Sequence, residues 1–407
     1  MPSEQSVKIA VRGLTKVFGE EPKEALALLR RGETKQAIFE KTGLAVGVAD
    51  ASFDVLEGET LVVMGLSGSG KSSLIRCLNR LSEPTAGQIL LDGQDIVPLG
   101  HRELLDLRRA KYGMVFQHFA LFPHRTVREN VELGLEIQGI AAEERAERAL
   151  GALKQVGLEG WDAASPEQLS GGMQQRVGLA RALAVEPDVL LMDEAFSALD
   201  PLIRRDMQQE LVALQSRVRK TIVFITHDLD EALFLGSRIV LMKDARIEQV
   251  GTAEAILSSP ATPYVERFVA EVDKTKVLTA SAVMRRPRSV AFTTDGPRTV
   301  LRKMDDEDLS SLCVVEPDFR LRGVVRDDAA LESVRRGETS IRAILEPGVP
   351  AVRADTPVRD LFGLLAETTL PAPVVDDAGR LQGVVVRASL LQGLAEPVNG
   401  DPGARAR

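Results

Sequence analysis

Several residue types that mark special classes of protein are scarce in this sequence. Only two of its 407 residues are cysteine, Cys77 and Cys313, one is tryptophan, and aromatic residues make up 4%. The two cysteines lack the short spacing of metal ligands, so we expect two buried free thiols rather than a disulfide framework or a zinc site. No apolar run reaches the ~18 residues that a membrane-spanning helix needs.

Positive charge is also in deficit. Lysine and arginine total 51 against 59 aspartate and glutamate, and the formal net charge of −8 argues against nucleic acid as the main partner. The N-terminal stretch "MPSEQSVKIAV" lacks the charged start and apolar core of a signal peptide, which predicts a cytosolic chain. The length predicts two or three domains, and the proportions of charged (27%) and hydrophobic (44%) residues are typical of folded globular chains.

The first quarter of the chain predicts strands around a helical stretch. Residues 7–12 alternate like a strand, and "GLTKVFGE" predicts a turn directly after them. The segment "PKEALALLRRGETKQAIFEKTG" predicts two short helices broken near Gly32. Residues 46–64 predict two strands joined by the turn "LEGE", and a helix is expected after Lys71.

The middle of the chain alternates strands and helices. In "EERAERALGALKQVGL" the apolar residues recur at helical spacing and predict one buried face. That face comprises Ala146, Ala149, Leu150, Leu153 and Val156. The runs "DVLLMDE" and "TIVFITHD" are typical of strands buried on both faces of a parallel sheet. Strand–helix alternation to about residue 245 predicts an α/β domain.

The last third of the chain contains an internal repeat. Residues 287–331 align without a gap on 347–391, and the clearest match is "VVEPDFRLRGVV" against "VVDDAGRLQGVV". A repeat of sixty residues that occurs twice predicts a pseudo-symmetric pair of small modules.

The segment "GLSGSGKS" fits the phosphate-loop pattern G-x-x-x-x-G-K-[ST]. It follows the apolar strand "LVVM" and precedes a helix, which is the context that the motif requires. Its backbone N–H groups would face the phosphates of ATP, with Lys71 at the β/γ-phosphates and the Ser72 hydroxyl on Mg²⁺. The residues expected to contact ATP here are Gly65, Leu66, Ser67, Gly68, Ser69, Gly70, Lys71, Ser72 and Ser73.

Polar residues follow three of the expected strands. "VLLMDE" ends in two carboxylates, of which Asp193 is expected to hold Mg²⁺ and Glu194 to act as the base that polarises the attacking water. His227 ends the strand of "TIVFITHD" and is a candidate contact to the γ-phosphate. Gln117, just past another strand in "GMVFQHF", would join Mg²⁺ to the attacking water. The expected Mg²⁺ ligands are therefore Ser72, Gln117 and Asp193.

A second anion site is indicated about a hundred residues after the first. "LSGGMQQRVGLARAL" has two glycines and then a helix, whose N-terminus favours an anion. Together with the phosphate loop, Gln117, "LLMDE", "SALD" and His227, this order resembles an ATP-binding-cassette ATPase over residues 7 to about 270. The family's "LSGGQ" signature has Met173 here in place of the more usual glutamine.

The resemblance implies how the two anion sites work together. In this family two cassettes stack head to tail, so Ser170, Gly171 and Gly172 of one copy would meet the γ-phosphate held by the other. Asp200 in "SALDPL" resembles the loop that links the two sites, and Phe18 in "KVFG" matches the aromatic residue on which adenine stacks. The resemblance therefore implies a homodimer that hydrolyses two ATP molecules and is inactive as a monomer.

Three further features resemble the ATPases of glycine betaine/proline importers. They are the long insertion from Gly19 to Ala45, the segments "EAFSALDPLIRRDMQQELVALQ" and "FQHFALFPHRTVREN", and the repeat, which suits a C-terminal pair of cystathionine-β-synthase (CBS) modules. The implied fold is α/β, an ATP-binding-cassette P-loop NTPase domain with a mixed sheet and a helical subdomain, followed by a tandem α+β CBS pair. Its expected parts are residues 1–272, with a helical insertion at 20–45 and a helical subdomain at about 118–185, CBS modules at 277–337 and 341–396, and a disordered tail at 397–407.

The implied function is that of the energy-coupling ATPase of an osmoprotectant importer. It would sit peripherally on the cytoplasmic face of the cell membrane, bound to an integral-membrane permease through Phe119, Leu121 and Phe122, and act indirectly with an extracytoplasmic binding protein. Importers of another amine or of methionine, and soluble cassette ATPases of DNA repair or translation, are the alternatives. A catalytically silent regulatory cassette is disfavoured by the intact catalytic residues.

The CBS pair resembles modules that bind nucleotides or sense ionic strength. Asp327 and Ser389 are candidate remnants of a nucleotide site, but the hydroxyl-then-acid pattern of such sites is absent from both repeats. The basic run Arg285, Arg286 and Arg288 is a candidate contact for an anionic headgroup or a dinucleotide, or else a solvated run. A purely structural or dimerising role for the pair also stays open.

Overall fold

The structure is a computed structural model that describes residues 6–117, 119–270, 275, 277–368 and 370–395. The predicted tail at 397–407 lies outside the described residues. By its internal contacts the chain divides into two compact units, Met1–Ile256 with Pro260–Ala270 and Leu257–Ser259 with Glu271–Arg407. None of the helices among the described residues combines the length and the hydrophobicity of a membrane-spanning segment.

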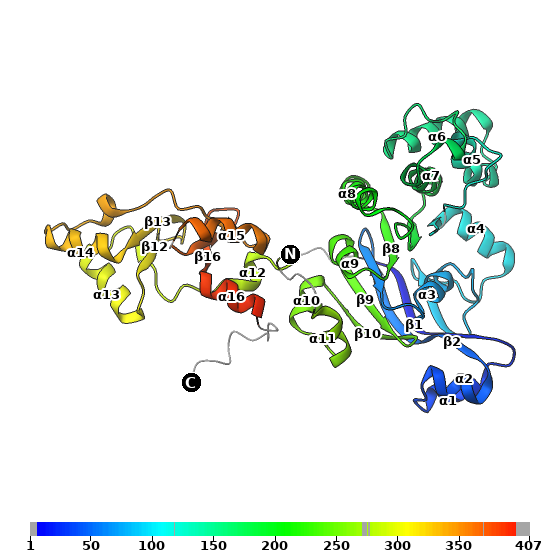
Figure 1. Cartoon of the computed structure of the whole chain (residues 1–407), viewed down its shortest axis with the longest axis horizontal. Coiled ribbons are helices and arrows are strands. Elements are labelled where there is room, and N and C mark those ends of the chain that lie inside the picture. Colours follow the sequence, from blue (N-terminus) through cyan, green and yellow to red (C-terminus); the bar gives the residue numbers. More distant parts are fainter. Residues whose placement is uncertain (1–5, 118, 271–274, 276, 369, 396–407) are drawn as a thin grey trace. The chain divides into compact units, whose positions relative to one another are not determined.

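A six-stranded sheet forms the centre of the first unit (Figure 1). Its order is β10-β9-β3-β8-β7-β6, and every neighbouring pair is parallel except β9 and β10. The strands are β3 (Thr60–Met64), β6 (Tyr112–Val115), β7 (Val189–Asp193), β8 (Thr221–Thr226), β9 (Arg238–Lys243) and β10 (Arg246–Gly251). Every residue of β7 and β8 is buried, which confirms the prediction of a parallel sheet covered on both faces.

A four-stranded antiparallel sheet in the order β2-β1-β4-β5 lies against the first. It contains β1 (Val7–Phe18), β2 (Ala45–Leu56), β4 (Ala86–Leu91) and β5 (Gln94–Asp95). The predicted turn after residue 12 is wrong, because β1 continues and pairs Phe18 with Ala45. Gly13 has a φ of 59°, and the register shifts between Val11 and Leu14. A glycine with positive φ accommodates a bulge within a strand as readily as a turn.

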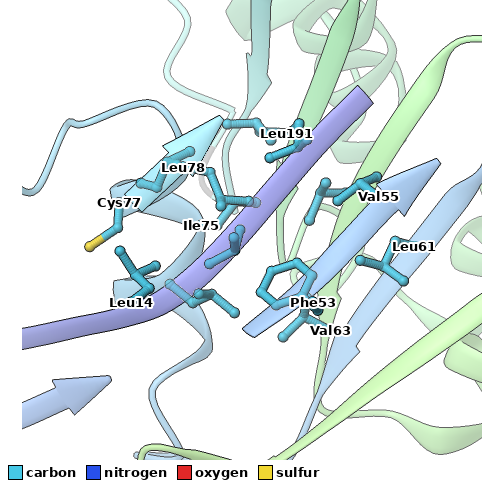
Figure 2. Close-up of a cluster of buried hydrophobic side chains, with 14 of the residues drawn as sticks. Leu14, Phe53, Val55, Leu61, Val63, Ile75, Cys77, Leu78 and Leu191 are labelled. Carbon is cyan, nitrogen blue, oxygen red and sulfur yellow. The ribbon is translucent and has the colours of Figure 1, made fainter. Parts of the chain in front are cut away.

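The main core of this unit lies between its sheets and around helix α3 (Lys71–Leu78). Leu14 of β1, Phe53 of β2, Leu61 of β3 and Ile75 of α3 converge in one cluster (Figure 2). Because α3 begins at the phosphate loop, the buried apolar face of this helix fixes where the loop lies.

The remaining helices up to residue 270 lie around and beyond the sheets. They are α1 (Lys23–Arg30), α2 (Lys35–Thr42), α4 (His101–Lys111), α5 (Val127–Ile137), α6 (Ala142–Gln155), α7 (Gly171–Ala184), α8 (Pro201–Val218), α9 (Leu229–Leu235), α10 (Ala253–Ser258) and α11 (Pro263–Val269), with a 3₁₀ turn at Pro166–Gln168. Helices α5, α6 and α7 pack on one another and form a helical part beyond the sheet (Figure 1).

The predicted buried face of α6 is partly wrong. Ala149, Leu153 and Val156 are buried, Ala146 is half-buried, and Leu150 is 44% exposed. The predicted stripe is wider than the surface that α5 and α7 cover, so its edge at Leu150 faces outward.

The second unit contains two copies of one small fold. Each copy has a three-stranded sheet whose first pair of strands is parallel and whose second pair is antiparallel. The first copy has β11 (Ala291–Phe292), α13 (Pro297–Glu307), β12 (Ser311–Val315), β13 (Leu321–Arg326), α14 (Asp327–Arg335) and the 3₁₀ turn Ile341–Ile344, which packs on α14 and β13. The second has β14 (Val352–Arg353), α15 (Val358–Glu367), β15 (Ala372–Val375), β16 (Leu381–Val385), α16 (Arg387–Ala395) and α12 (Ala280–Val283), which packs on α15 and α16. This duplication confirms the repeat.

Both cysteines are buried free thiols, as the sequence predicts. Burial raises the pKa of Cys77 to about 11 and that of Cys313 to about 12. Neither thiol is therefore ionised near neutral pH, which removes both from any nucleophilic role.

Candidate active site

The phosphate loop runs from Gly65 to Gly70, between the end of β3 and the start of α3. Gly65 and Gly70 have φ values of 153° and 104°. A Cβ at Gly65 would lie 2.2 Å from the Met242 carbonyl oxygen, and one at Gly70 would lie 2.2 Å from the Gly47 oxygen. Only glycine fits at either position, because the neighbouring contacts are backbone atoms that cannot move aside.

Lys71 is buried at the start of α3 and fills the inside of this loop. Its Nζ donates hydrogen bonds to the Gly65 oxygen at 2.8 Å and the Leu66 oxygen at 3.1 Å. Burial lowers the pKa of Lys71, and the charges of Glu194 and Asp193 oppose that shift. The loop also contains the hydroxyl of Ser69, which is buried and has no hydrogen-bond partner among the described residues. A buried cation and an unsatisfied donor in one glycine loop fit an anionic ligand.

Ser72 and Asp193 come together from α3 and β7. The Ser72 hydroxyl donates to Asp193 Oδ1 at 3.1 Å, and Arg76, one turn further along α3, contacts Asp193 Oδ2 at 3.4 Å. A hydroxyl and a carboxylate oxygen are the donors that Mg²⁺ prefers, so this pair fits the expected ion.

Glu194 follows β7 in the left-handed backbone region, with a φ of 47°. Its N–H donates to the Ile225 oxygen, which ties the residue to the neighbouring strand β8. Its Oε2 lies 3.5 Å from Nδ1 of His227, which follows β8. The strand pairing therefore brings the predicted base and the predicted histidine together at the carboxyl edge of the sheet, where ligands of α/β folds bind.

Gln117 lies two residues beyond β6 and is exposed. Strand β6 is parallel to β7 and pairs Val115 with Met192, so Gln117, which follows β6, and Asp193, the last residue of β7, lie at the same edge of the sheet. The segment after Gln117 includes Ala120 in the left-handed region, with a φ of 50°. Arg181 of α7 donates to the oxygens of Phe119 and Ala120 and so connects this segment to the second anion site.

A shallow groove of about 340 Å³ lies beside this segment. It is lined by Phe119, Ala120, Leu121, Pro123, Pro166, Glu167 and Gln174. Phe119 and Leu121, two of the three predicted docking residues, therefore line it. Phe122, the third, is not among its lining residues and is 40% exposed.

Ser170 and the two glycines stand at the N-terminus of α7. Ser170 caps the helix, accepting a hydrogen bond from the Met173 N–H at 3.4 Å, and is exposed. A Cβ at Gly172 would lie 2.4 Å from Cγ2 of Ile203, so this glycine allows α7 to approach α8 closely. Helix α7 packs on α5, α6, α8 and β6, whereas α3 packs on β1, β2, β7 and β8 (Figure 1). The second anion site of a chain therefore belongs to a different part of the unit from its phosphate loop.

Two further predicted residues are Asp200 and Phe18. Asp200 caps α8 and accepts hydrogen bonds from the N–H groups of Leu202 and Ile203 at 3.2 and 3.1 Å. The Phe18 ring is 43% exposed, and Lys16 Nζ lies 4.9 Å from its centroid. One exposed aromatic face beside the phosphate loop offers a surface for a nucleobase.

The second unit contains a cleft of about 460 Å³. Arg285, Arg286 and Arg288, the predicted basic run, all line it, together with Arg387. Arg387 is engaged with the oxygens of Leu365, Ala366 and Thr368.

The two candidate remnants of a nucleotide site do not line this cleft. Asp327 is exposed. The Ser389 hydroxyl is buried and bonds the Val386 backbone at the start of α16.

Sequence reasoning missed three residues at these sites. Arg76 was detectable, because it follows Ser72 by four residues and so lies on the same face of α3. Lys16 over the Phe18 ring follows from the period of a strand, which places both on one face. Lys35 of α2, whose Nζ lies 2.9 Å from the Gly68 oxygen, had no local signal.

Comparison with known proteins places both units in known families. The family model described as ABC transporter matches residues 48–197, and the CBS domain model matches residues 341–396. The glycine betaine/carnitine transport ATP-binding protein GbuA of Listeria monocytogenes is 51% identical over 388 residues, which cover 95% of this chain and 98% of that protein. The trimethylamine N-oxide transport system ATP-binding protein TmoW of Pelagibacter ubique is also 51% identical, over 69% of this chain and 82% of that protein.

A solved structure gives the same result for the first unit. The dimeric structure of a bacterial ABC transporter cassette, MJ0796, is 36% identical with a TM-score of 0.50 and covers 60% of this chain and 98% of that one. The glycine loop, the acid pair and the helix-capping serine all lie within the matched residues 48–197, and the chain belongs to the ABC transporter family as an ATPase with a C-terminal pair of CBS modules.

Proposed function

We propose that this chain is the energy-coupling subunit of an importer for glycine betaine- or proline-type compatible solutes. The observation that carries the proposal is the extent of its similarity. The relative named for glycine betaine and carnitine matches over 95% of this chain, whereas the one named for trimethylamine N-oxide matches over 69%. The likeness to the glycine betaine protein therefore extends through the second unit. That unit contains none of the residues proposed for ATP hydrolysis.

The residues of the first unit are suited to hydrolyse ATP with Mg²⁺. Lys71 and the loop N–H groups hold the phosphates, and Ser72, Asp193 and Gln117 offer oxygen donors to the ion. When bound, Mg²⁺ supplies positive charge that offsets charge on the β- and γ-phosphates. Glu194 orients the attacking water and accepts its proton, and His227 contacts the γ-phosphate from the neighbouring strand.

The catalytic unit is a head-to-tail homodimer. Helices α3 and α7 pack on different elements, which supports a second copy as the source of Ser170, Gly171 and Gly172 at each phosphate loop. These residues add a helix N-terminus and its N–H groups to the γ-phosphate. Asp200, at the start of α8, links the two sites. Loss of the γ-phosphate removes this contact, and the dimer reopens.

The groove beside Phe119 and Leu121 is the docking surface for a short helix of the membrane permease. Its lining is largely apolar and follows directly on Gln117, so the permease can respond to the occupancy of the catalytic site. The chain would then sit peripherally on the cytoplasmic face of the membrane. The solute-binding protein acts on the other side and touches this chain only through the permease.

The second unit is a regulator. Its arginine-lined cleft suits an anionic ligand such as a nucleotide, and exposed arginines also respond to ionic strength because salt screens them. The proposed boundaries are 1–272 for the cassette, with its insertion at 20–45 and helical subdomain at about 118–185, and 277–337 and 341–396 for the CBS modules.

The test is reconstitution of the full chain with its permease and binding protein in lipid vesicles. We expect glycine betaine or proline to stimulate ATP hydrolysis several-fold and methionine to have no effect. Stimulation by methionine or another amine alone would identify a different importer. Hydrolysis that no solute changes, and that DNA or ribosomes stimulate, would place the chain among the soluble cassette ATPases.

A further inference from the structure

The helical insertion between β1 and β2 begins and ends at the same place in the sheet. Phe18, the last residue of β1, pairs with Ala45, the first residue of β2. Between them α1 and α2 pack on a small core of their own around Val17, Ala25 and Ile38. The two helices therefore project as one body beside the ends of β1 and β2 (Figure 1).

Both ends of this insertion adjoin the nucleotide site. A Cβ at Gly47 would lie 2.6 Å from Cε2 of Phe18 and 2.9 Å from the Ser73 hydroxyl. A Cβ at Gly70 would in turn lie 2.2 Å from the Gly47 oxygen. The strand that leaves the insertion is thus in close contact with the phosphate loop and with the first turn of α3.

The middle of the insertion reaches the outside of the same loop. Lys35, the first residue of α2, donates from Nζ to the Gly68 oxygen at 2.9 Å and lies 3.3 Å from Oδ1 of Asp244. Asp244 belongs to the two-residue turn between β9 and β10. In that turn the Ala245 N–H donates to the Ser69 oxygen at 3.1 Å. Two successive outward carbonyls of the phosphate loop are therefore bonded to groups outside the loop.

These bonds restrain the planar peptide groups of the loop from outside. The peptide between Gly68 and Ser69 carries its N–H on the side opposite the carbonyl that Lys35 holds, and this N–H closes a turn with the Leu66 oxygen at 3.1 Å. A glycine-rich loop loses more conformational entropy than other segments when a ligand orders it. A loop already held from outside loses less conformational entropy when ATP binds. Its affinity for ATP is therefore higher.

We propose that Lys35 is a positioning residue through which the inserted helices brace the phosphate loop and raise its affinity for ATP. The proposal rests on the proposed function only in that the ligand is ATP. Lys35 takes no part in the chemistry, since its contacts are to the outer Gly68 carbonyl of the loop and to Asp244. The insertion is thereby a third element that supports the phosphate loop, beside the sheet and the β9–β10 turn.

The test compares Lys35→Met with Lys41→Met in the full chain. Lys41 lies on the same helix and pairs with Glu33 at 2.6 Å, so its loss removes the same charge without touching the loop. We expect Lys35→Met to raise the Kd for ATP by about threefold to tenfold, because the loop loses one hydrogen bond from a charged, partly exposed donor. The KM for ATP should rise by a similar factor. We expect kcat to stay within about twofold and Lys35→Arg to restore the affinity.

Two measurements distinguish a direct contact with the loop from a long-range effect of the lysine charge on ATP binding and from misfolding of the variant. The Kd ratio between the two variants should persist at high salt, because a direct contact is screened less than a distant charge. The melting temperature without nucleotide should be equal in both variants, and the shift that ATP adds should be smaller for Lys35→Met. Equal ATP affinities for Lys35→Met and Lys41→Met, or a fall in kcat with KM unchanged, would overturn the inference. The solute response of the wild-type chain tests the proposed function separately.

Discussion

Shared catalytic sites make a quantitative prediction about mixed dimers. In one heterodimer, Lys71→Ala is placed in one copy and Ser170→Arg in the other. In a head-to-tail dimer, one site then combines the altered phosphate loop with the altered Ser170 position and is inactive. The other site combines an unchanged phosphate loop with an unchanged Ser170. We therefore expect about half of the wild-type ATPase rate per dimer, since a twofold axis would relate the two sites of such a dimer.

The matched control places both changes in one copy and pairs it with a wild-type partner. Each site then contains one ruined half, so we expect no activity. If each chain instead worked alone, the outcomes would reverse. The heterodimer with one change in each copy would have no ATPase activity, and the control would have about half of the wild-type rate.

The structure indicates that both substitutions leave the fold intact. Ser170 is exposed and its cap bond to the Met173 N–H is long, at 3.4 Å, so its loss costs about 1 kcal/mol or less. Lys71 is buried with its ammonium group on two loop carbonyls, so its removal also removes a desolvated charge.

The assay is phosphate release at saturating ATP from heterodimers purified through two different tags. Each homodimeric variant is measured beside them and should be inactive. ATPase activity in the control heterodimer, together with no activity in the heterodimer that has one change in each copy, would refute the shared site.

Glu194→Gln should keep ATP affinity and slow phosphate release by about 10²- to 10⁴-fold, because the amide has the same shape but cannot accept a proton; a normal rate would remove Glu194 as the base. Asp188→Asn should lower the free energy of unfolding by about 2 kcal/mol in urea titrations, because Lys8, whose side chain is 11% exposed, keeps only one carboxylate. Burial raises the pKa of Asp188, but hydrogen bonds from Lys111 and Lys8 outweigh it and the pKa is lowered. The wild-type advantage should thus be full above the unfolded-state pKa of about 4 and be lost as the pH falls through the lower folded-state pKa; an advantage that does not shrink as the pH falls below about 4 would contradict this. Replacing Arg286 and Arg288 with glutamine should flatten the salt dependence of solute-stimulated ATP hydrolysis in vesicles, and an unchanged salt curve would exclude the cleft as the sensor.

The sequence alone determined the parts of the site that depend on local geometry. A glycine loop between a strand and a helix fixes where Lys71 and Ser72 lie, because their positions follow from a few residues of backbone. Asp193 ends one buried apolar strand, and Glu194 and His227 directly follow such strands. The parallel order of these strands brings their carboxyl ends to one edge. The repeat of sixty residues likewise predicted two copies of one small fold.

Only the tertiary structure decided which of these parts meet and which stay apart. The separation of α7 from α3 depends on which helices pack together, and no local pattern encodes it. The bond from Lys35 to Gly68, the exposure of Leu150 and the arrangement of arginines around one cleft also depend on residues distant in sequence. Periodicity reports that a side chain has a buried or an exposed face, but the partner on that face is chosen by the packing of the whole unit.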